Sequence, residues 1–318
     1  MIHRWDVLGL GAIAVDDLLY VDGYPEPDTK SRIIDRRREG GGLVGTALVT
    51  VTRLGGSAAC IGVLGDDELS RYTIAEFERD GVDCSRMVRR DGARPIHSVI
   101  IVDRQTGQRT LLYDLDGVIQ PDCADVTSSD VGACRVLLVD STMPVVARHA
   151  IELAHQTGIP VVADLEDADA AGVLELISEI DHLIVGQSFG AEVTGERLPA
   201  EIVRALWRPG HTACVVTAGA EGCWYIARAS QGRLVHHPAP SVVAIDTNGC
   251  GDVFHGAYAA SLARGGGVTN AIAVATIAAS IKATAPGGRR GIPDRATVER
   301  HLHDATRDVP TDACTGTA

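Results

Sequence analysis

Two aspartates and two glycines lie close together in the stretch DTNGCGDVF, residues 246–254. The apolar run SVVAI before it and the small residues after it predict a junction between a strand and a helix. Backbone N–H groups at a helix N-terminus lack partners within the helix and favour negative charge. Gly249, Cys250 and Gly251 could therefore form an anion hole for a transferred phosphoryl group, and Asp252 could accept a proton from an attacking hydroxyl. Aspartate is also a common helix N-cap, so this stretch alone leaves both roles of Asp252 open.

Three further stretches contain residues that could bind a ligand. VVTAGAEGCWY (215–225) predicts a buried strand that ends in a glycine turn, at the edge where parallel sheets place their ligands. REGGGLVGTALVTVTRLGG (38–56) predicts a three-glycine turn that opens a helix and lets the backbone approach a ligand closely. A strand candidate ends in Asp16 and Asp17, and Asp28 follows the next turn. Such carboxylates can accept hydrogen bonds from sugar hydroxyls, whereas the alternative for Asp16 is a solvated strand end.

The elements that would position these residues alternate along the chain. From about residue 130 onward, short apolar runs alternate with longer helical segments, which is typical of βαβ units and a parallel sheet buried on both faces. The strand candidates WDVLGLGAIAVDDLLYV and SAACIGVLG are expected to join the same sheet. Residues 29–38 and 95–115 instead alternate polar and apolar residues, and the second segment turns at Thr106-Gly107. Both segments predict antiparallel strands that form a flap or lid.

Composition and charge argue against several classes of protein. With 318 residues, of which 45% are hydrophobic, the chain is long enough for a large α/β core. Its formal net charge of −13 argues against nucleic acid or an anionic membrane surface as the main partner. No apolar run approaches the length of roughly 20 residues that spans a membrane. The eight cysteines are scattered without metal-ligand spacing, so we expect reduced thiols and a cytoplasmic location.

The order of these stretches resembles the ribokinase (PfkB) family of carbohydrate kinases over roughly residues 6 to 302. DTNGCGDVFHGAYAASLARG is similar to the family's carboxyl-terminal signature, D-T-x-G-x-G-D-x-F, and GGGLVGTALVTVTRLGGSAACIGVLGDD is similar to its amino-terminal glycine signature. VVTAGAEG resembles the family's T-x-G-x-x-G turn beside the nucleotide. APGGRRGIP, residues 285–293, resembles its late loop near the adenine and a monovalent cation.

The resemblance implies a three-layer α/β/α sandwich with a mostly parallel central sheet and a small antiparallel β lid. We therefore expect one kinase domain over residues 1–303, with the lid strands inserted at about 12–45 and 95–115. The polar residues 304–318 lack periodicity and predict a flexible tail. The resemblance also implies ATP with Mg²⁺ and a small-molecule sugar as ligands, K⁺ as a further cofactor, and a homodimer formed through the lid.

Each residue that matches a family motif acquires an implied role. Asp252 matches the catalytic base, and the anion hole matches Gly249, Cys250 and Gly251. The positions implied to bind substrate are Asp16, Asp28, Gly41, Gly42, Thr46 and Arg109. The positions implied to lie along ATP are Thr217, Gly219, Gly222, Ala283 and Gly287. The positions implied to hold a monovalent cation are Asp246, Asn248 and Gly291.

The sequence departs from the family pattern at positions that bear on substrate and metal. Many sugar kinases have an asparagine where this chain has Thr46, and Leu43 and Ala14 also replace polar residues. We therefore expect one wall of the sugar pocket to be less polar than in ribokinase. The family's N-x-x-E motif, which helps to organise Mg²⁺, is absent, since Gly186 and Phe189 occupy its positions. This absence and the spacing of the first acidic residues resemble the ketohexokinase branch and its sulfosugar-kinase relatives.

Several arginines on the predicted lid have two interpretations. Arg109 follows the hairpin turn and either points toward phosphates or lies in solvent. Arg36, Arg37 and Arg38 form a wet strand face or attract an anionic sugar. The sequence cannot separate these alternatives, because strand alternation does not say which face meets the ligand.

Three hypotheses for the function follow. The first is an ATP-dependent kinase that phosphorylates a hydroxyl of a small sugar, a ketose or an anionic derivative. The second is a nucleoside kinase of the same fold, which would need an aromatic residue in the flap to stack on the base, either Tyr24 or Tyr113. The third is a catalytically silent regulator that binds sugar or nucleotide, which the lost asparagine and N-x-x-E positions would favour.

Overall fold

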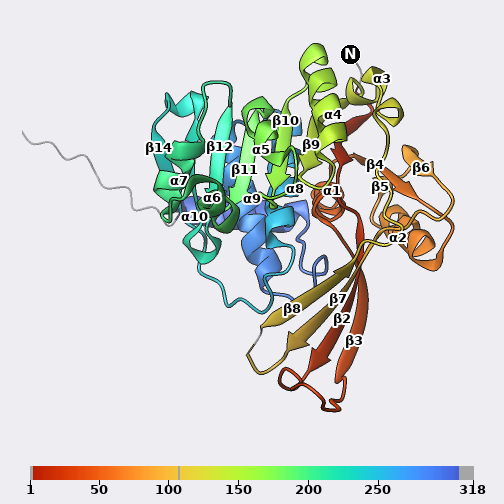
Figure 1. Ribbon diagram of the computed structural model, residues 1–318. Coiled ribbons are helices and arrows are strands. Elements are labelled where there is room, and N and C mark those ends of the chain that lie inside the picture. Colours follow the sequence, from red (N-terminus) through yellow and green to blue (C-terminus); the bar gives the residue numbers. More distant parts are fainter. Residues whose placement is uncertain (1–2, 107, 308–318) are drawn as a thin grey trace, which may run out of the picture.

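A large, mostly parallel sheet forms the centre of the computed structural model, which describes residues 3–106 and 108–307 (Figure 1). Its strands, in spatial order, are β14 (Leu234–His237), β13 (Cys223–Ala227), β12 (Ala213–Thr217), β11 (His182–Gly186), β10 (Val161–Leu165), β9 (Cys134–Asp140), β1 (Trp5–Leu10), β4 (Ala58–Leu64) and β5 (Val82–Asp83), with β6 (Met87–Arg89) also paired to β4. All neighbours from β12 to β5 are parallel, and the β12–β13 and β13–β14 pairings at one edge are antiparallel. The predicted central sheet is therefore confirmed.

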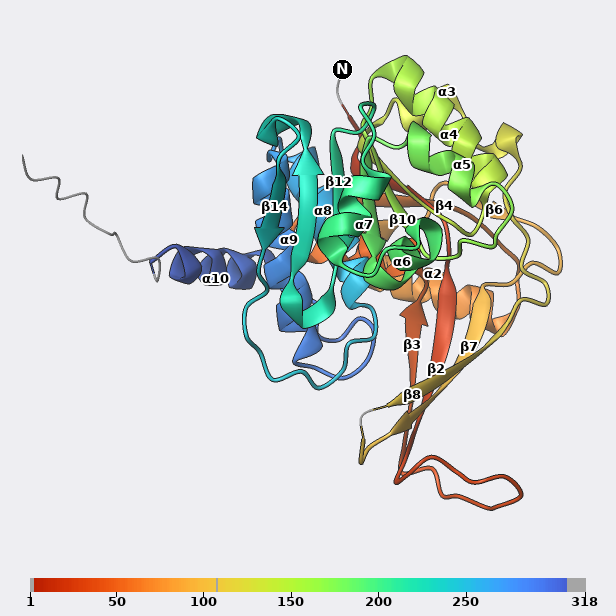
Figure 2. The same cartoon turned by 60° about the vertical axis from the view of Figure 1, so that its left-hand side comes forward.

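Helices cover both faces of this sheet and complete three layers (Figures 1 and 2). One buried core lies between the sheet and α1 (Leu43–Arg53), α2 (Glu68–Arg79), α8 (Cys250–Ala263), α9 (Val268–Ala283) and α10 (Arg295–Arg307). The other lies beneath α3 (Ser128–Val131), α4 (Pro144–Thr157), α5 (Val173–Leu176), α6 (Gln187–Thr194) and α7 (Pro199–Leu206). None of the described helices combines the length and hydrophobicity that a membrane span requires.

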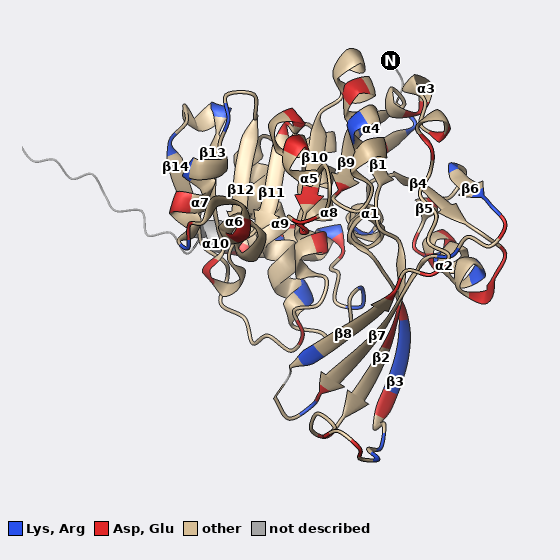
Figure 3. Ribbon diagram, in the orientation of Figure 1, with Lys and Arg blue, Asp and Glu red and all other residues tan. Residues whose placement is uncertain are grey.

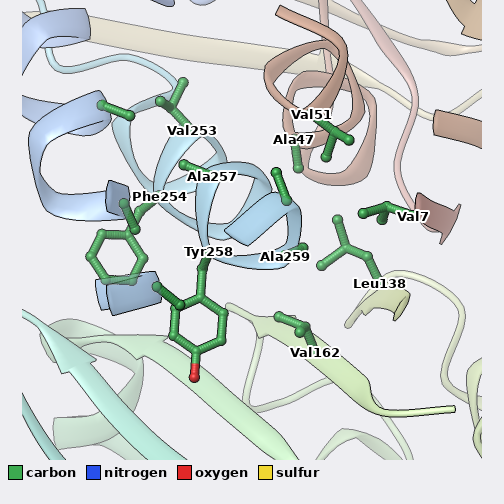
Figure 4. Packing of buried hydrophobic residues seen from close by; sticks show 14 of the residues in the cluster. Val7, Ala47, Val51, Leu138, Val162, Val253, Phe254, Ala257, Tyr258 and Ala259 are labelled. Carbon is green, nitrogen blue, oxygen red and sulfur yellow. The ribbon is translucent and has the colours of Figure 1, made fainter. Parts of the chain in front are cut away.

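Helix α8 passes through the middle of the first core (Figure 4). Its residues are small and apolar on every side, which is typical of a helix that packs on all its faces. A side chain at Gly256 would overlap the backbone of α1 at Ala47, so the two helices approach closely. At its far end Tyr258 is fully buried, and its hydroxyl lies 2.9 Å from His182 Nδ1. These contacts fix the N-terminus of α8, which carries the candidate catalytic residues.

A separate four-stranded sheet forms the lid and projects from the main body (Figure 1). Its strands, in spatial order, are β3 (Asp35–Gly41), β2 (Ala14–Val21), β7 (Ile96–Asp103) and β8 (Arg109–Asp114). The two outer pairs are antiparallel, as predicted, whereas β2 and β7 at the centre are parallel. Strand alternation places Asp16 on one face of the lid and Asp17 on the other.

The structure corrects three boundaries that were predicted from the sequence. The first strand candidate is divided, because Asp140 Oδ2 accepts a hydrogen bond of 2.6 Å from Ala12 N–H and occupies the space beside Gly11. Its first half, β1, joins the main sheet, and its second half, β2, joins the lid. In the lid, residues 29–34 are exposed and form no strand, since the pairing with β2 begins at Asp35.

The SVVAI run is the third segment that the sequence misassigned. Residues 238–249 contain no strand, and Val243 is 84% exposed. The run is held instead by Ala283, whose main-chain oxygen accepts hydrogen bonds from Ile245 and Asp246 N–H. The predicted helix after the motif is confirmed, with Gly249 as its N-cap at a φ of 76°.

Two predicted features lie at the limits of the described residues. Helix α10 continues to Arg307, so the first four residues of the predicted tail are helical. The remainder of that tail, residues 308–318, lies outside the described residues. Gly107 of the predicted lid hairpin also lies outside them, although the strands on either side, β7 and β8, pair as expected.

Candidate active site

Two cavities meet at the N-terminus of α8. The larger is a cleft of about 800 Å³ between the lid and the carboxyl ends of the central strands. The smaller, about 360 Å³, lies between the turn that follows β12, residues 239–244 and α9. Thr247 and Gly251 line both cavities. A group held at this end of α8 therefore faces the contents of both.

Most of the residues predicted from the sequence line one of these two cavities. Those that line the larger cleft are Asp16, Gly41, Gly42, Thr46, Arg109, Asn248, Gly249, Gly251 and Asp252. Those that line the smaller cavity are Thr217, Gly219, Gly222, Cys250, Gly251 and Ala283. The structure thus separates the residues expected to bind sugar from those expected to bind nucleotide, and it brings both groups together at the anion-hole glycines.

Four predicted site residues line neither cavity: Asp246, whose contacts are described below, and Asp28, Gly287 and Gly291. Asp28 is exposed on the loop of residues 22–34 that joins β2 and β3, which lies at the end of the lid farthest from the main body in Figure 2. Gly287 lies against the Glu39 carboxylate rather than in the smaller cavity. Gly291 packs against the backbone of Lys282. The positive φ of Gly287, 87°, and the close packing of Gly291 explain these two glycines without a ligand.

Asp252 lies in the first turn of α8 and lines the larger cleft. Burial, together with the nearby carboxylates of Asp164 and Glu166, raises the pKa of Asp252 well above its ordinary value. Arg289 opposes this shift. The Asp252 side chain caps no backbone N–H of α8, so no contact supports its alternative role as a helix cap. A carboxylate with a raised pKa is a stronger proton acceptor once it is ionised.

Asp16 is the second carboxylate of the cleft. It is 9% exposed, and burial raises its pKa to about 6, while a hydrogen bond from Ser98 and the charge of Arg289 act in the opposite direction. A Cβ at Gly41 would overlap the Asp16 carboxylate. Part of the glycine signature therefore makes room for this carboxylate instead of contacting a ligand directly.

Arg289 is a buried residue of the site that the sequence did not identify. It is 4% exposed, and its guanidinium donates to the Gly41 main-chain oxygen (2.8 Å) and to Thr46 Oγ1 (3.3 Å). A Cβ at Gly40 would overlap the guanidinium, so this glycine is needed for Arg289 to reach the cleft floor. Thr46 was expected to contact the sugar in place of an asparagine, but its hydroxyl oxygen accepts this hydrogen bond from Arg289. The pair Arg-Arg in APGGRRGIP was visible in the sequence, but its burial was not.

Arg109 connects the lid to the phosphoryl-transfer end of α8. It extends from the first position of β8, and its Nη1 lies 3.4 Å from Thr247 Oγ1 and 3.6 Å from Asp246 Oδ1. Because Thr247 lines both cavities, Arg109 is placed where phosphate oxygens would cross from one to the other. This geometry favours the phosphate-facing interpretation over the solvated one.

The remaining lid arginines are engaged with the lid itself. Arg38 donates two hydrogen bonds of 2.9 Å to Asp17, whose pKa it lowers to about 2. Arg36 lies on the same face, and Arg37 pairs with Asp35 at 2.9 Å. Figure 3 shows this basic stretch along β3. These contacts support the interpretation of the lid arginines as part of a solvated strand face. They give no support to the capture of an anionic sugar by Arg38.

The residues implied to hold a monovalent cation do not fit one. Asp246 Oδ1 and Oδ2 accept hydrogen bonds of 2.8 Å from Asn248 N–H and Gly287 N–H. The main-chain oxygen of Asp246 accepts a hydrogen bond of 2.9 Å from Lys282 Nζ. K⁺ binds several oxygens at once, and each of these three oxygens already accepts a hydrogen bond. One of the donors is the Lys282 ammonium group, so a positive charge already contacts Asp246.

Two carboxylates at the end of β10 fit a hydrated Mg²⁺. Glu166 lines the larger cleft, and Asp164 Oδ2 is buried without a hydrogen-bond partner, although His255 Nδ1 lies 3.1 Å from it. Among the described residues, no group of three or more His, Cys, Asp or Glu side chains is arranged to hold a metal by itself. Mg²⁺ commonly keeps several waters and binds through one or two carboxylates plus phosphate oxygens. The buried Phe189 takes no part in this, although the family motif has a carboxylate there.

The smaller cavity is lined in part by residues that were predicted to form a strand or had no predicted role. The segment 239–244 forms one wall and contributes Pro240, Val242 and Ala244. Phe254 and the α9 residues Ala279 and Ser280 form the other. Mostly apolar lining with a few hydroxyl groups is typical of a pocket for a flat heterocycle. The apolar character of SVVAI was the available signal, but it was interpreted as strand burial.

Comparison with known proteins gives one consistent result. A family model described as pfkB family carbohydrate kinase matches residues 6–295. Fructokinase-1 from Zea mays is 28% identical over 235 residues, which cover 68% of this chain and 72% of that one. Ketohexokinase from Mus musculus is 25% identical over 279 residues, which cover 84% and 92% of the two chains. The crystal structure of ribokinase from Thermotoga maritima, 24% identical, shares the fold with a TM-score of 0.80 and covers 94% of this chain and 99% of its own.

Proposed function

Because the chain belongs to the pfkB family of carbohydrate kinases, and is a phosphotransferase with a hydroxyl acceptor, we propose that it phosphorylates a small sugar with ATP. The acceptor is a ketose or an anionic derivative of one. The observation that carries this proposal is the meeting of two cavities at the N-terminus of α8, with Asp252 in the wall of the larger one.

The proposed transfer uses groups of the chain at that junction. ATP lies in the smaller cavity with its phosphates toward Thr247 and Gly251. Asp252 accepts the proton of the sugar hydroxyl, and the N–H groups of Gly249 to Gly251 stabilise charge on the transferring group. Asp164 and Glu166 would hold a hydrated Mg²⁺, which would supply neutralisation of phosphate charge. Closure of the lid excludes water that would otherwise accept the phosphoryl group.

The walls of the larger cleft support a sugar as acceptor. Asp16, Ser98 and Asp252 present hydrogen-bonding groups on one side. Leu43 and Leu111 contribute apolar surface, consistent with the expectation of a less polar wall. Fructokinases and a ketohexokinase are among the relatives of the chain, and their names specify fructose or a ketohexose as acceptor. These names and the cleft chemistry support a ketose.

One observation favours the alternative of a nucleoside acceptor. Tyr113 extends from β8 into the larger cleft and is 66% exposed, so its ring is available for stacking on a base. The other candidate, Tyr24, belongs to the loop at the end of the lid and does not line the cleft. The nucleoside hypothesis therefore rests on Tyr113 alone.

A screen of acceptors with the purified protein tests the proposal. ADP formation is followed by a coupled assay with fructose, other ketoses, sugar acids, sulfosugars, ribose and adenosine, each in the presence of MgATP. We expect a ketose or its anionic derivative to raise ATP turnover above the rate without acceptor. Adenosine as the best acceptor would favour the nucleoside alternative. Sugar binding by calorimetry without any turnover would identify a silent regulator and contradict the proposal.

We also propose that two chains associate through the outer face of the lid. Strand register places Leu19, Val99, Ile101 and Leu112 on the face opposite Asp16, beside Arg36 and Arg38 of β3, and Leu112 is 55% exposed. An apolar patch with a charged edge on an otherwise exposed sheet favours burial by a symmetric partner. Light scattering is expected to give the mass of two chains for the protein and of one chain for Leu112→Lys. A monomeric mass of the unmodified protein at micromolar concentration would contradict this arrangement.

A further inference from the structure

Lys282, in the last turn of α9, is a charged side chain that the phosphoryl-transfer steps do not use. It is 0% exposed, and its Nζ donates a hydrogen bond of 2.9 Å to the main-chain oxygen of Asp246. A fully buried lysine is rare unless it is paired. Its position beneath the 246–254 motif, directly before α8, therefore requires an explanation.

The groups around Lys282 form a site for a single positive charge. Burial lowers the pKa of the Lys282 ammonium group, and the charge of Arg109 acts in the same direction, whereas the nearby Asp246 and Glu39 carboxylates oppose this shift and favour the charged form. Both Glu39 oxygens are buried without a hydrogen-bond partner, although Arg290 Nε lies 3.3 Å from one of them. The buried Glu39 carboxylate thus has no hydrogen bond to offset its burial, and a positive charge close to it stabilises its ionised form.

We propose that the ammonium group of Lys282 is a built-in substitute for a dissociable monovalent cation. Lys282 and K⁺ carry the same charge, and Lys282 Nζ contacts the main-chain oxygen of Asp246, one of the residues implied to hold the ion. The Asp246 carboxylate accepts hydrogen bonds from Asn248 N–H and Gly287 N–H, and Gly291 packs against the backbone of Lys282. The protein therefore does not require K⁺.

Lys282 acts on catalysis as a positioning residue. Its Nζ donates a hydrogen bond to the Asp246 main-chain oxygen, and the Asp246 carboxylate accepts hydrogen bonds from the N–H groups of Asn248 and Gly287. These contacts fix the turn that leads into Gly249, where the anion hole begins. Displacement of a group by about 1 Å can reduce a rate by about 10²-fold, even when the change is far from the chemistry. The effect on rate rests on the proposed function, whereas the effect on ion binding does not.

The first test uses the unmodified protein. Melting temperature and the affinity for a non-hydrolysable ATP analogue are measured in KCl, NaCl and tetramethylammonium chloride at equal ionic strength. We expect the three salts to give the same melting temperature and the same affinity within a factor of about two, since a specifically bound ion would stabilise the folded state by mass action. A rise of several degrees or a tenfold tighter affinity only in KCl would overturn the proposal. Neither readout requires phosphoryl transfer, so failure of the proposed function would not imitate this result.

The second test removes the ammonium group. Lys282→Met keeps an unbranched side chain of similar length, and Lys30→Met, in the exposed loop of residues 22–34, is the matched control. We expect Lys282→Met to lower kcat by about 10²-fold in tetramethylammonium chloride and to regain part of it in KCl, with little change in the KM for sugar. Lys30→Met should behave as the unmodified protein. A full kcat for Lys282→Met without K⁺ would contradict the role, and if this variant does not fold, the salt comparison on the unmodified protein still decides.

Discussion

Replacing Asp252 by asparagine is expected to lower kcat by about 10²- to 10⁴-fold, the range typical of a lost general base. The affinities for sugar and nucleotide should stay within a few-fold, because asparagine keeps the shape of the side chain and its hydrogen-bonding reach. The measurement is steady-state kinetics with the acceptor found by the screen, together with calorimetric titration of an ATP analogue. Asp91→Asn, at an exposed position outside both cavities, is the control and should leave both quantities unchanged.

The raised pKa of Asp252 also predicts an effect on stability. Its folded-state pKa lies above the unfolded value, so its contribution to stability is present at low pH and is lost as pH rises through the folded pKa. The melting temperature of Asp252→Asn relative to the unmodified protein should therefore increase as pH rises. Activity should fall on the acid side, because Asp252 must be ionised to accept a proton and Asp16, with a pKa of about 6, must be ionised to bind hydroxyls. A pH-independent difference in melting temperature would contradict this assignment.

Replacing Arg289 by methionine is the second change with a large expected effect. The guanidinium is buried and is the positive charge that acts on both Asp16 and Asp252. Removing it also leaves the Gly41 main-chain oxygen and Thr46 Oγ1 without their buried donor, and a buried group left unsatisfied typically costs about 1–3 kcal/mol. We expect the free energy of unfolding, measured by denaturant titration at neutral pH, to fall by about that amount.

Two further measurements separate the electrostatic role of Arg289 from its packing. Without Arg289 the pKa of Asp16 should rise above about 6, so the acid limb of the activity profile should move to higher pH. The loss of stability should also be smaller at acid pH, where the two carboxylates are protonated. Arg295→Met, at an exposed pair with Glu299 on α10, should change stability by less than about 1 kcal/mol. Equal losses of stability for Arg289→Met at pH 5 and pH 8 would contradict the electrostatic role.

The catalytic stretch and the glycine turns were predictable from the sequence because their chemistry is local. Gly249 caps α8 with a positive φ, and Gly222 turns between β12 and β13 with a φ of 89°, where a side chain would overlap backbone atoms. A backbone with a positive φ requires glycine at that position, so the spacing of the glycines is visible in the sequence. The parallel sheet was predictable for a similar reason, since strands buried on both faces are apolar throughout.

The buried charges were not predictable, because tertiary contacts alone decide which charged side chain is covered. Arg289 and Arg290 are neighbours of the same type, yet the first is buried and the second has a side chain 62% exposed. Lys282 ends an apolar helix where it could equally have reached solvent. Val242 and Ala244 of SVVAI line a cavity instead of pairing in a strand. Asp28 lies on an exposed loop, and the length of that loop did not indicate that it points away from the cleft. Hydrophobic pattern cannot distinguish these outcomes.

Transfer of label from γ-phosphate-labelled ATP to sugar tests the central claim most directly. The unmodified protein and Asp252→Asn are incubated side by side with fructose, or with the best acceptor of the screen, and labelled sugar phosphate is separated and counted. We expect labelled sugar phosphate in equal amount to ADP from the unmodified protein, and a loss of about 10²-fold or more from Asp252→Asn at equal nucleotide binding. Equal label from both proteins, or ADP without labelled sugar, would contradict phosphoryl transfer at the N-terminus of α8.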